Sequence, residues 1–290
     1  MNATAAAWRA RGRWVDVAGE TVFVVDLDAA APDGTPPLLV LHGFPSSSFD
    51  FHRVVDALAR RRRVVLFDYP GYGLSAKPDR PYTLRGQADV AVALCARFGI
   101  GRLGLLTHDI GDTVGGELLA RSLEGSWAAE VTDRVVTNGS LYMDLARLSE
   151  GQRLLLGLPD QRLAPGTLGR AAVLAGLTAT LAPDAEVSEG ELEAVWELID
   201  HHGGAELLPR LIRYVEERRA LEGRFTPPVE THASPLTVVW GTADPIAVEA
   251  MAARLAARRP DARVVRLGGV GHYPMLEAPR RFVAAVDPGG

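Results

Sequence analysis

Short runs of hydrophobic residues alternate along the chain with longer segments in which hydrophobic residues recur at helical spacing. We predict strands at residues 14–17, 21–25, 38–41, 64–67, 103–106, 135–137, 236–240 and 262–267. The predicted helices cover residues 51–60, 84–98, 112–123, 246–258 and 278–286. The first two strands are typical of a hairpin. The others are short and hydrophobic on both faces, which indicates a mostly parallel sheet with helices on both of its faces.

This alternation stops between residues 141 and 231. The segment shows helical patterns that are separated by clusters of glycine and proline, and it contains no strand pattern. The alternation resumes with the strand at residues 236–240. We therefore predict an α/β core domain formed by residues 1–140 and 232–290, into which residues 141–231 are inserted as a helical cap.

The composition narrows the class of protein. The chain has 290 residues, of which 47% are hydrophobic and 23% are charged, so it is long and hydrophobic enough for a large core. Its net charge of −5 gives no basic surface for nucleic acid or an anionic membrane, and the arginine run at residues 60–63 is predicted as a solvated helix end. We expect neither kind of partner, and the sequence does not indicate an oligomeric state.

Two further features concern the compartment. The single cysteine, Cys95, excludes an intramolecular disulfide and lies in a helical pattern, which predicts a buried thiol. No hydrophobic stretch reaches the roughly 18 residues of a membrane span, and the first residues lack the pattern of a signal peptide. We therefore expect a cytoplasmic protein.

Polar or glycine-rich stretches follow several predicted strands. HGFP, DYPGYG, THDIGD and GTADPI each come directly after a strand, and GVGHYP follows the last one. In an open parallel sheet, loops at the carboxyl ends of the strands meet at one edge and form the site of reaction. The five stretches are therefore predicted to lie together.

Three of these stretches carry residues suited to nucleophilic catalysis. Asp109 could simply cap the following helix, but the stretch from Thr107 to Gly111 also fits the pattern small-x-nucleophile-x-small of a tight strand-turn-helix elbow. Asp244 follows a later strand, and His272 lies in a glycine-rich loop. Nucleophile, acid and histidine in this chain order match the order of a hydrolase triad.

The motifs HGFP, DYPGYGLSAKP, THDIGD, GTADPI and GHYPMLE together resemble the α/β-hydrolase fold. Within that fold they resemble the group with an aspartate nucleophile, which contains epoxide hydrolases and haloalkane dehalogenases. The cap stretch SEGELEAVWELIDHHGG, with LLPRLIRYVEERRALEGRF and VTNGSLY, is similar to the group formed by the mesoderm-specific transcript protein and its bacterial relatives. The resemblance covers about residues 12–286, and in similar enzymes the bond before the proline of HGFP is cis.

The resemblance implies a mechanism with a covalent intermediate. A carboxylate is already an anion at neutral pH, so Asp109 would displace a leaving group from a saturated carbon and form an alkyl ester. His272, oriented by Asp244, would then activate water to hydrolyse that ester. The backbone N–H groups of Phe44 and Ile110 would form the oxyanion hole. We expect a small apolar organic substrate and water as reactants, and no cofactor.

An epoxide is the predicted substrate, with a diol as the product. Opening an epoxide creates an alkoxide, and epoxide hydrolases supply it with hydrogen bonds from cap tyrosines. Tyr214 lies where such a tyrosine occurs in similar enzymes, although a rim position on an amphipathic helix would also explain it. The second tyrosine is missing from its usual segment, and Tyr142 is its predicted substitute.

A haloalkane dehalogenase is the alternative. A halide needs N–H donors, and in that group a tryptophan commonly follows the nucleophile, where this chain has Ile110. Phe44 stands where some dehalogenases have an asparagine donor, which leaves Trp196 as a possible cap donor or as a core residue. Asn138 resembles a residue of one dehalogenase subgroup. A further alternative is a ligand-binding protein without turnover on a hydrolase scaffold.

Two polar features remain without an assigned role. Asp112 would suit the positive end of the helix that follows Asp109, or it would raise the pKa of Asp109 by like-charge proximity. His201, His202 and His232 lack the accompanying carboxylates or cysteines of a metal site, so we predict none.

Overall fold

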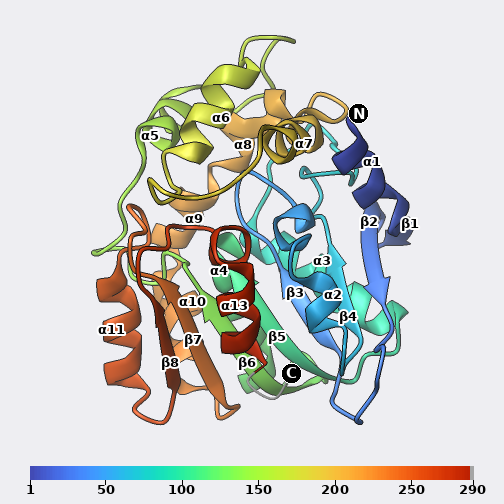
Figure 1. Ribbon diagram of the computed structural model, residues 1–290, viewed down its shortest axis with the longest axis vertical. Helices are drawn as coiled ribbons and strands as arrows, with labels where there is room; N and C mark the ends of the chain where they lie inside the picture. Colours follow the sequence, from blue (N-terminus) through green and yellow to red (C-terminus); the bar gives the residue numbers. More distant parts are fainter. Residues whose placement is uncertain (288–290) are drawn as a thin grey trace.

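An eight-stranded sheet runs through the computed structural model, which describes residues 1–287 (Figure 1). The strand order is β1-β2-β4-β3-β5-β6-β7-β8. The strands are β1 (Gly12–Val17), β2 (Glu20–Leu27), β3 (Leu38–Leu41), β4 (Val64–Phe67), β5 (Arg102–His108), β6 (Glu130–Thr137), β7 (Leu236–Gly241) and β8 (Arg263–Leu267). Every strand predicted from the sequence is present.

The pairing of the strands also follows the hydrophobic pattern. β1 and β2 form the antiparallel hairpin, β2 pairs antiparallel with β4, and the remaining neighbours are parallel. All residues of β3 and β4 are buried, as expected for strands that are covered on both faces. Figure 1 shows α2 (Val55–Leu58) and α13 (Pro279–Val286) on the near face of the sheet, and α3 (Leu84–Arg97), α4 (Ile110–Leu123) and α10 (Glu222–Thr231) on the far face. The α/β fold with a mostly parallel sheet is confirmed.

Three predicted helices have different bounds. The helix expected at residues 51–60 is a 3-10 helix, η1 (Ser48–Phe51), followed by the single turn of α2, although Phe51, Val54, Val55 and Leu58 are buried at the expected helical spacing. The helix expected from residue 246 is α11 (Glu249–Arg258), since the N–H groups of Ile246 and Ala247 donate to Asp244 instead. The last predicted helix begins one residue later, at Pro279, as α13, and a single helical turn, α12 (Pro274–Glu277), lies in the loop before it.

One helix was not predicted. Residues Ala3–Ala10 form α1, capped by the side chain of Asn2, and Trp8 is buried beneath it. The Asn2 side chain also donates to the Gly190 carbonyl. The main-chain N–H of Asn2 donates to Glu197 of α7 (Glu189–Asp200) at 2.5 Å. An alanine-rich segment has high helix propensity but little hydrophobic pattern, so its long-range contacts with α7 decide its position.

The inserted segment contains helices only. These are α5 (Glu150–Gly157), α6 (Arg170–Thr178), α7, η2 (Ala205–Leu207), α8 (Leu208–Leu211), α9 (Tyr214–Ala220) and α10. Figure 1 shows α5 to α8 gathered over one end of the sheet, whereas α10 lies lower, beside the strands. α10 packs against α4, where Arg224 pairs with the buried Glu117 at 2.5 Å. The predicted cap is therefore a layer of helices, and its last helix also covers the sheet.

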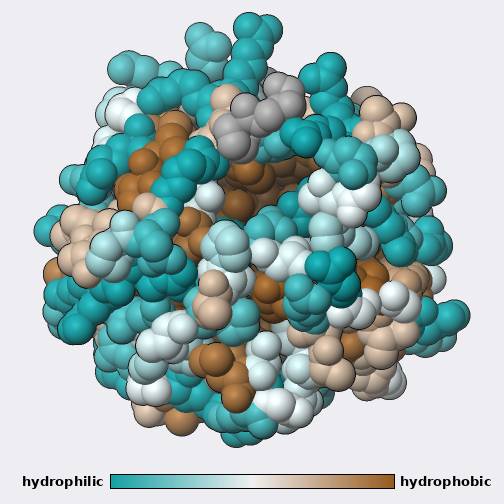
Figure 2. Space-filling model, turned by 90° about the horizontal axis from the view of Figure 1, so that it is seen from below, coloured by the Kyte–Doolittle hydropathy of each residue, from teal (hydrophilic) through white to brown (hydrophobic). Residues whose placement is uncertain are grey.

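The arginine run lies at the amino end of β4, which is the end of the sheet away from the cap. Each of Arg61, Arg62 and Arg63 forms an ion pair with an aspartate, so the run does not form a patch of uncompensated positive charge. Figure 2 views the molecule from that end and shows a mostly hydrophilic surface. Cys95 is buried as predicted, and burial raises the pKa of its thiol to about 12. Within residues 1–287, none of the helices combines the length and the apolar character that crossing a membrane requires.

Candidate active site

Asp109 lies in a sharp turn between a strand and a helix. β5 ends at His108 and α4 begins at Ile110, so Asp109 alone makes the turn, with a φ of 50° that L residues rarely adopt. Gly111 allows the helix to start against β3, because a Cβ there would lie 2.3 Å from the Leu41 carbonyl oxygen. The structure thus contains the predicted elbow, with a buried carboxylate at its tip.

The HGFP loop contacts this carboxylate. The N–H of Phe44 donates to Asp109 Oδ2 at 2.8 Å, and Gly43 permits the approach, since a Cβ there would lie 2.9 Å from Asp109 Cβ. The N–H of Ile110, in the first turn of α4, has no acceptor within the helix. Both predicted oxyanion-hole residues therefore flank Asp109. The bond between Phe44 and Pro45 is cis, as in the similar enzymes.

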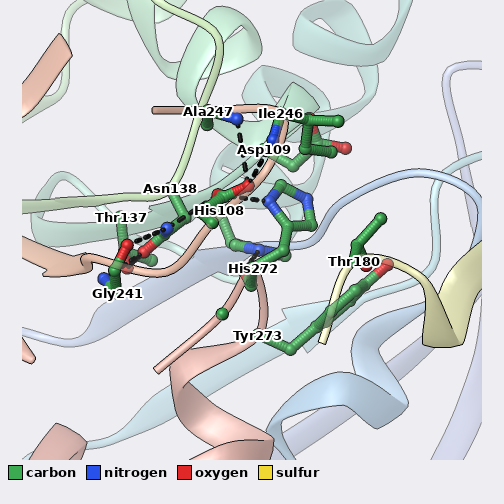
Figure 3. A network of polar contacts seen from close by, with 12 residues as sticks. His108, Asp109, Thr137, Asn138, Thr180, Gly241, Ile246, Ala247, His272 and Tyr273 are labelled. Carbon is green, nitrogen blue, oxygen red and sulfur yellow. Dashed lines mark hydrogen bonds and ion pairs between the residues drawn. The ribbon is translucent and has the colours of Figure 1, made fainter. Parts of the chain in front are cut away.

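His272 and Asp244 form a buried pair. Nδ1 of His272 lies 2.7 Å from Asp244 Oδ2, while Asp244 Oδ1 accepts the N–H groups of Ile246 at 2.8 Å and Ala247 at 3.0 Å. Figure 3 shows this network, with Asn138 on one side of His272 and Tyr273 on the other. The acid is held by main-chain groups, so it fixes the plane of the imidazole.

Asn138 supports Asp244 from behind. Its Nδ2 donates to Asp244 Oδ2 at 2.8 Å and to the Gly241 carbonyl at 3.2 Å, while its Oδ1 accepts the N–H of Gly241 at 2.9 Å. The structure does not place Asn138 as a donor to a leaving group, because its amide is used by Gly241 of β7 and by Asp244. The sequence could not show this, since Asn138 and Gly241 are far apart in the chain.

The other nitrogen of His272 is available for chemistry. Nε2 is buried and has no hydrogen-bond partner among residues 1–287. Burial lowers the pKa of His272, but the charge of Asp244, the hydrogen bond to it and the charge of Asp109 raise the pKa to about 9. The imidazolium is therefore stabilised in the resting site, where two carboxylates surround it.

The loop that carries His272 is held by two groups that the sequence reasoning missed. The ring of His108 hydrogen-bonds through Nε2 to the His272 carbonyl at 2.8 Å, and burial lowers the pKa of His108 well below its usual value, so this nitrogen is the donor of a neutral ring. Glu277 accepts the N–H groups of Gly271 at 2.8 Å and Tyr273 at 2.9 Å. The only feature of the sequence that pointed to His108 was its position next to Asp109.

Tyr214 from the cap lies near the elbow. Its ring centroid is 5.5 Å from that of Phe44, and its hydroxyl accepts a hydrogen bond from Gln152 Nε2 at 3.3 Å. Burial and the charge of Asp109 raise the pKa of Tyr214 above its usual value, so its hydroxyl keeps its proton. The predicted position of Tyr214 beside the site agrees with these contacts.

The other two predicted cap residues lie elsewhere. The hydroxyl of Tyr142 donates to Glu230 at 2.9 Å, and Arg254 stacks 4.8 Å from the ring centroid, so Tyr142 does not replace the missing second tyrosine. Trp196 lies in α7, packs partly buried against the core, and is not one of the residues that line the cavity. Trp196 is therefore a packing residue, which was the second of the two interpretations of its position in the sequence.

A cavity of about 120 Å³ connects His272 with the cap. α5 and α6 form its walls, and Phe44, Gln152, Thr180 and Tyr273 are its more polar or aromatic members. Most of the lining is aliphatic: Leu154, Leu155, Leu168, Val173, Leu177 and Ile246. Tyr273 stands in the GVGHYP motif, which was interpreted only for its histidine, and Gln152 lies in the cap outside any motif.

Asp112 is buried directly below the elbow. Its Oδ1 accepts the hydroxyl of Thr107, and its Oδ2 has no hydrogen-bond partner among residues 1–287. Burial raises the pKa of Asp112 to about 8, and the charge of Asp109 contributes. The like-charge proximity of the two carboxyl groups therefore raises the pKa of Asp112, which stays protonated near neutral pH. The described residues contain no cluster of three or more His, Cys, Asp or Glu side chains suited to a metal ion.

Comparison with known proteins agrees with this geometry. The family model described as "Alpha/beta hydrolase family" matches residues 38–286. The chain belongs to this family. LipZ of Mycobacterium tuberculosis, which its name calls a hydrolase, is 37% identical over 96% of this chain and 95% of its own length. The present chain is also 29% identical to the human mesoderm-specific transcript homolog protein, over 96% of the chain and 85% of the human protein. The haloalkane dehalogenase 2 of M. tuberculosis is 28% identical, over 94% and 93% of the two chains.

Proposed function

We propose that this α/β hydrolase acts through a covalent alkyl ester of Asp109 and hydrolyses epoxides to diols. The observation that carries the proposal is the carboxylate at the elbow: one oxygen accepts the N–H of Phe44 at 2.8 Å, and the buried Nε2 of His272 has no partner among residues 1–287. A nucleophile, an oxyanion-hole donor and a base are therefore present in one small region.

The first step needs no base. The Asp109 oxygen that is not bound by Phe44 attacks a carbon of the epoxide, a carbon–oxygen bond of the ring breaks, and the alkyl ester forms. The released alkoxide accepts a hydrogen bond from the hydroxyl of Tyr214 as it takes up one proton. The high pKa of Tyr214 suits this role, because the phenol is protonated before the alkoxide forms.

The second step uses His272. Its Nε2 takes a proton from water, and the hydroxide attacks the carbonyl carbon of the ester. The N–H groups of Phe44 and Ile110 stabilise the tetrahedral oxyanion until the diol leaves. Esterification neutralises Asp109, whose charge raises the pKa of His272 in the resting site. Formation of the ester therefore lowers the pKa of His272 and favours the neutral imidazole at the stage where a base is needed.

The contacts around the elbow favour an epoxide over a halide. Ile110 offers no side-chain N–H to a leaving halide, and Trp196 packs in α7. A haloalkane dehalogenase is the second candidate function, because one relative is named haloalkane dehalogenase 2. The aliphatic lining of the cavity supports an apolar substrate with an alkyl chain between α5 and α6.

Trapping the ester tests the proposal. The His272→Gln variant is incubated with a panel of alkyl epoxides and bromoalkanes, and the mass of the intact protein is measured. We expect the mass of one substrate to be added at Asp109, and the wild-type protein to release diol. Release of bromide without diol would identify a dehalogenase, and tight binding without product would indicate a ligand-binding protein.

Isotope labelling tests the covalent step separately. In a single turnover in heavy-oxygen water, the label should enter Asp109 first and the product only in later turnovers. Label that appears directly in the product would exclude the ester mechanism.

A further inference from the structure

A second polar cluster lies beside the triad, and the mechanism above does not use it. It consists of Asp50 in η1, Ser46 in the HGFP loop and Tyr273, which follows the triad histidine. All three residues are buried. A buried polar group without an evident structural partner is costly, which makes this cluster a candidate for function.

Asp50 has the contacts of a protonated acid. Its side chain is fully buried, its Oδ2 lies 2.5 Å from the Ser46 hydroxyl, and its Oδ1 has no hydrogen-bond partner among residues 1–287. Burial raises the pKa of Asp50 to about 8, while the Ser46 hydrogen bond and the charge of His272 lower the pKa; Asp68 and Asp109 raise it. A carboxylate with a single hydrogen bond is poorly stabilised there, whereas a neutral carboxyl group suits the site.

Tyr273 connects this acid to the cavity. Its side chain lines the cavity next to His272, and its hydroxyl donates to the Phe44 carbonyl at 3.3 Å. A hydrogen bond with Ser46 lowers the pKa of Tyr273, although burial raises it well above its usual value. The Ser46 hydroxyl thus bridges the phenol and the acid.

We propose that Tyr273 is the second proton donor to the opened epoxide and that Ser46 and Asp50 resupply its proton. This inference rests on the proposed function. Tyr214 and Tyr273 both contact Phe44, whose N–H binds the nucleophile, so both side chains lie next to the residue that holds the attacking carboxylate. Tyr273 takes the place of the second cap tyrosine, which Tyr142 does not fill.

The protons of this relay balance. As the carbon–oxygen bond of the ring breaks, the alkoxide takes a proton from Tyr273, Tyr273 takes one from Ser46, and Ser46 takes one from Asp50. Asp50 becomes a carboxylate in the same step in which Asp109 becomes a neutral ester, so the net charge of the site is unchanged. Hydrolysis of the ester releases the diol and leaves Asp109 as a carboxylic acid. The proton that Asp109 then loses returns Asp50 to its neutral form.

The rate of ester formation measures this relay. In a His272→Gln background the ester accumulates, and the rate is followed by the increase in protein mass. We expect Tyr273→Phe to slow ester formation from an alkyl epoxide at least about tenfold, which is less than the roughly 10²–10⁴-fold of general acid catalysis because Tyr214 remains. In a background with His272 intact, the same substitution should leave the rate of ester hydrolysis within about twofold. A merely structural defect would slow both steps.

Asp50→Asn provides a second variant and a pH profile. In the His272→Gln background, ester formation should decline only as the pH rises above about 8, because loss of the His272 charge raises the pKa of Asp50 further, and Asp50→Asn should be slower and lack that decline. The charged or titratable groups facing Asp50 are Asp68, Asp109 and Tyr273, with His272 removed by substitution. Asp112→Asn is the matched control, because Asp112 is also a buried carboxyl group near Asp109 with a pKa of about 8. This control should keep both the rate and the decline.

The outcomes separate the two proposals. If no epoxide forms an ester in His272→Gln, the proposed function fails, and the relay fails with it. If the ester forms and Tyr273→Phe forms it as fast as the parent does, the relay is wrong and the proposed function stands. If Tyr273→Phe does not fold, the comparison of Asp50→Asn with Asp112→Asn decides: equal rates and equal pH profiles overturn the relay.

Discussion

The edge of the sheet and the cap contribute different chemistry to the same cavity. The sheet holds Asp109, Asp244 and His272 at the end of a strand or in the loop after one, and His272 is the member of the three that lines the cavity. The cap supplies mainly aliphatic side chains from α5 and α6. Reacting groups need fixed positions, whereas an apolar wall only needs to exclude water and match a shape. The proposed chemistry therefore belongs to the sheet, and substrate selection belongs to the cap.

The two regions are joined at the triad histidine. The N–H of His272 donates to the carbonyl of Thr180 in the cap at 3.0 Å, and Glu277 accepts the N–H of Ala182 at 2.9 Å. A Cβ on Gly271 would lie 2.5 Å from the nitrogen of Ala182, so the two backbones are in direct contact. A movement of the loop at Thr180 would thus be transmitted to His272, although we propose that selectivity and chemistry come from different segments.

The largest effect is expected at the elbow. Asp109→Ala should reduce turnover by about 10⁴-fold or more, because it removes the nucleophile. Asp112→Asn, three residues later, should keep turnover within about tenfold, since Asp112 is already neutral near pH 7 and only its contact with Thr107 changes. Product formation under saturating substrate measures both. Equal losses in the two variants would show that the acidic pair acts as a unit.

A smaller loss is expected behind the triad. Asn138→Gly removes the amide that supports Asp244, while glycine accepts the φ of 46° at this position. Hydrolysis of the ester should slow by about tenfold, because general-base catalysis is impaired and not removed, and ester formation should not change. Single-turnover kinetics separates the two rates. A loss confined to ester formation would contradict the assignment of Asn138 to Asp244.

The cap should affect substrate preference and not the chemical step. Ala172→Phe places a ring on the cavity side of α6, whereas Ala171→Phe places the same ring on a neighbouring exposed residue outside the lining. For epoxides with long alkyl chains, Ala172→Phe should raise KM by about tenfold, the equivalent of losing contact with roughly two methylene groups. Ala171→Phe should have little effect. A KM series over chain length tests this pair, and identical series would place the substrate elsewhere.

The smallest effect is a shift in titration. The negative charge of Asp109 stabilises the His272 imidazolium, so Asp109→Ala should move the pKa of His272 downward from about 9. Below that pKa the ring is protonated, and a lower value makes it neutral over a wider pH range. Nuclear magnetic resonance titration of the histidine ring follows the change. An unchanged pKa would mean that esterification of Asp109 does not prepare His272 as a base.

The site at the edge of the sheet was predictable because its signals are local. A hydrophobic run, a tight turn with small residues and a helix identify the elbow at Asp109 from a few consecutive positions. Asp244 and His272 follow later strands in the triad's chain order, and the structure brings the pair to 2.7 Å. The roles of the three residues remain predictions, whereas their placement in the fold is confirmed.

The cap residues were less predictable for the opposite reason. Tyr142 and Trp196 have the right chemistry, but their neighbours Glu230, Arg254 and the core come from distant segments. A helical pattern indicates which residues face the protein interior, but it does not indicate which residues they contact there. Tyr214 was placed beside the site only through a resemblance to similar enzymes.

The sequence by itself determined the parallel sheet, the inserted helices and the three residues at the strand ends, because these depend on short-range periodicity and on chain order. Only the tertiary structure decided that Asn138 supports Asp244 and that Asp50 and Ser46 lie beside Tyr273. Such contacts join residues far apart in the chain, where burial changes both pKa and partner choice. Local composition carries no record of either effect.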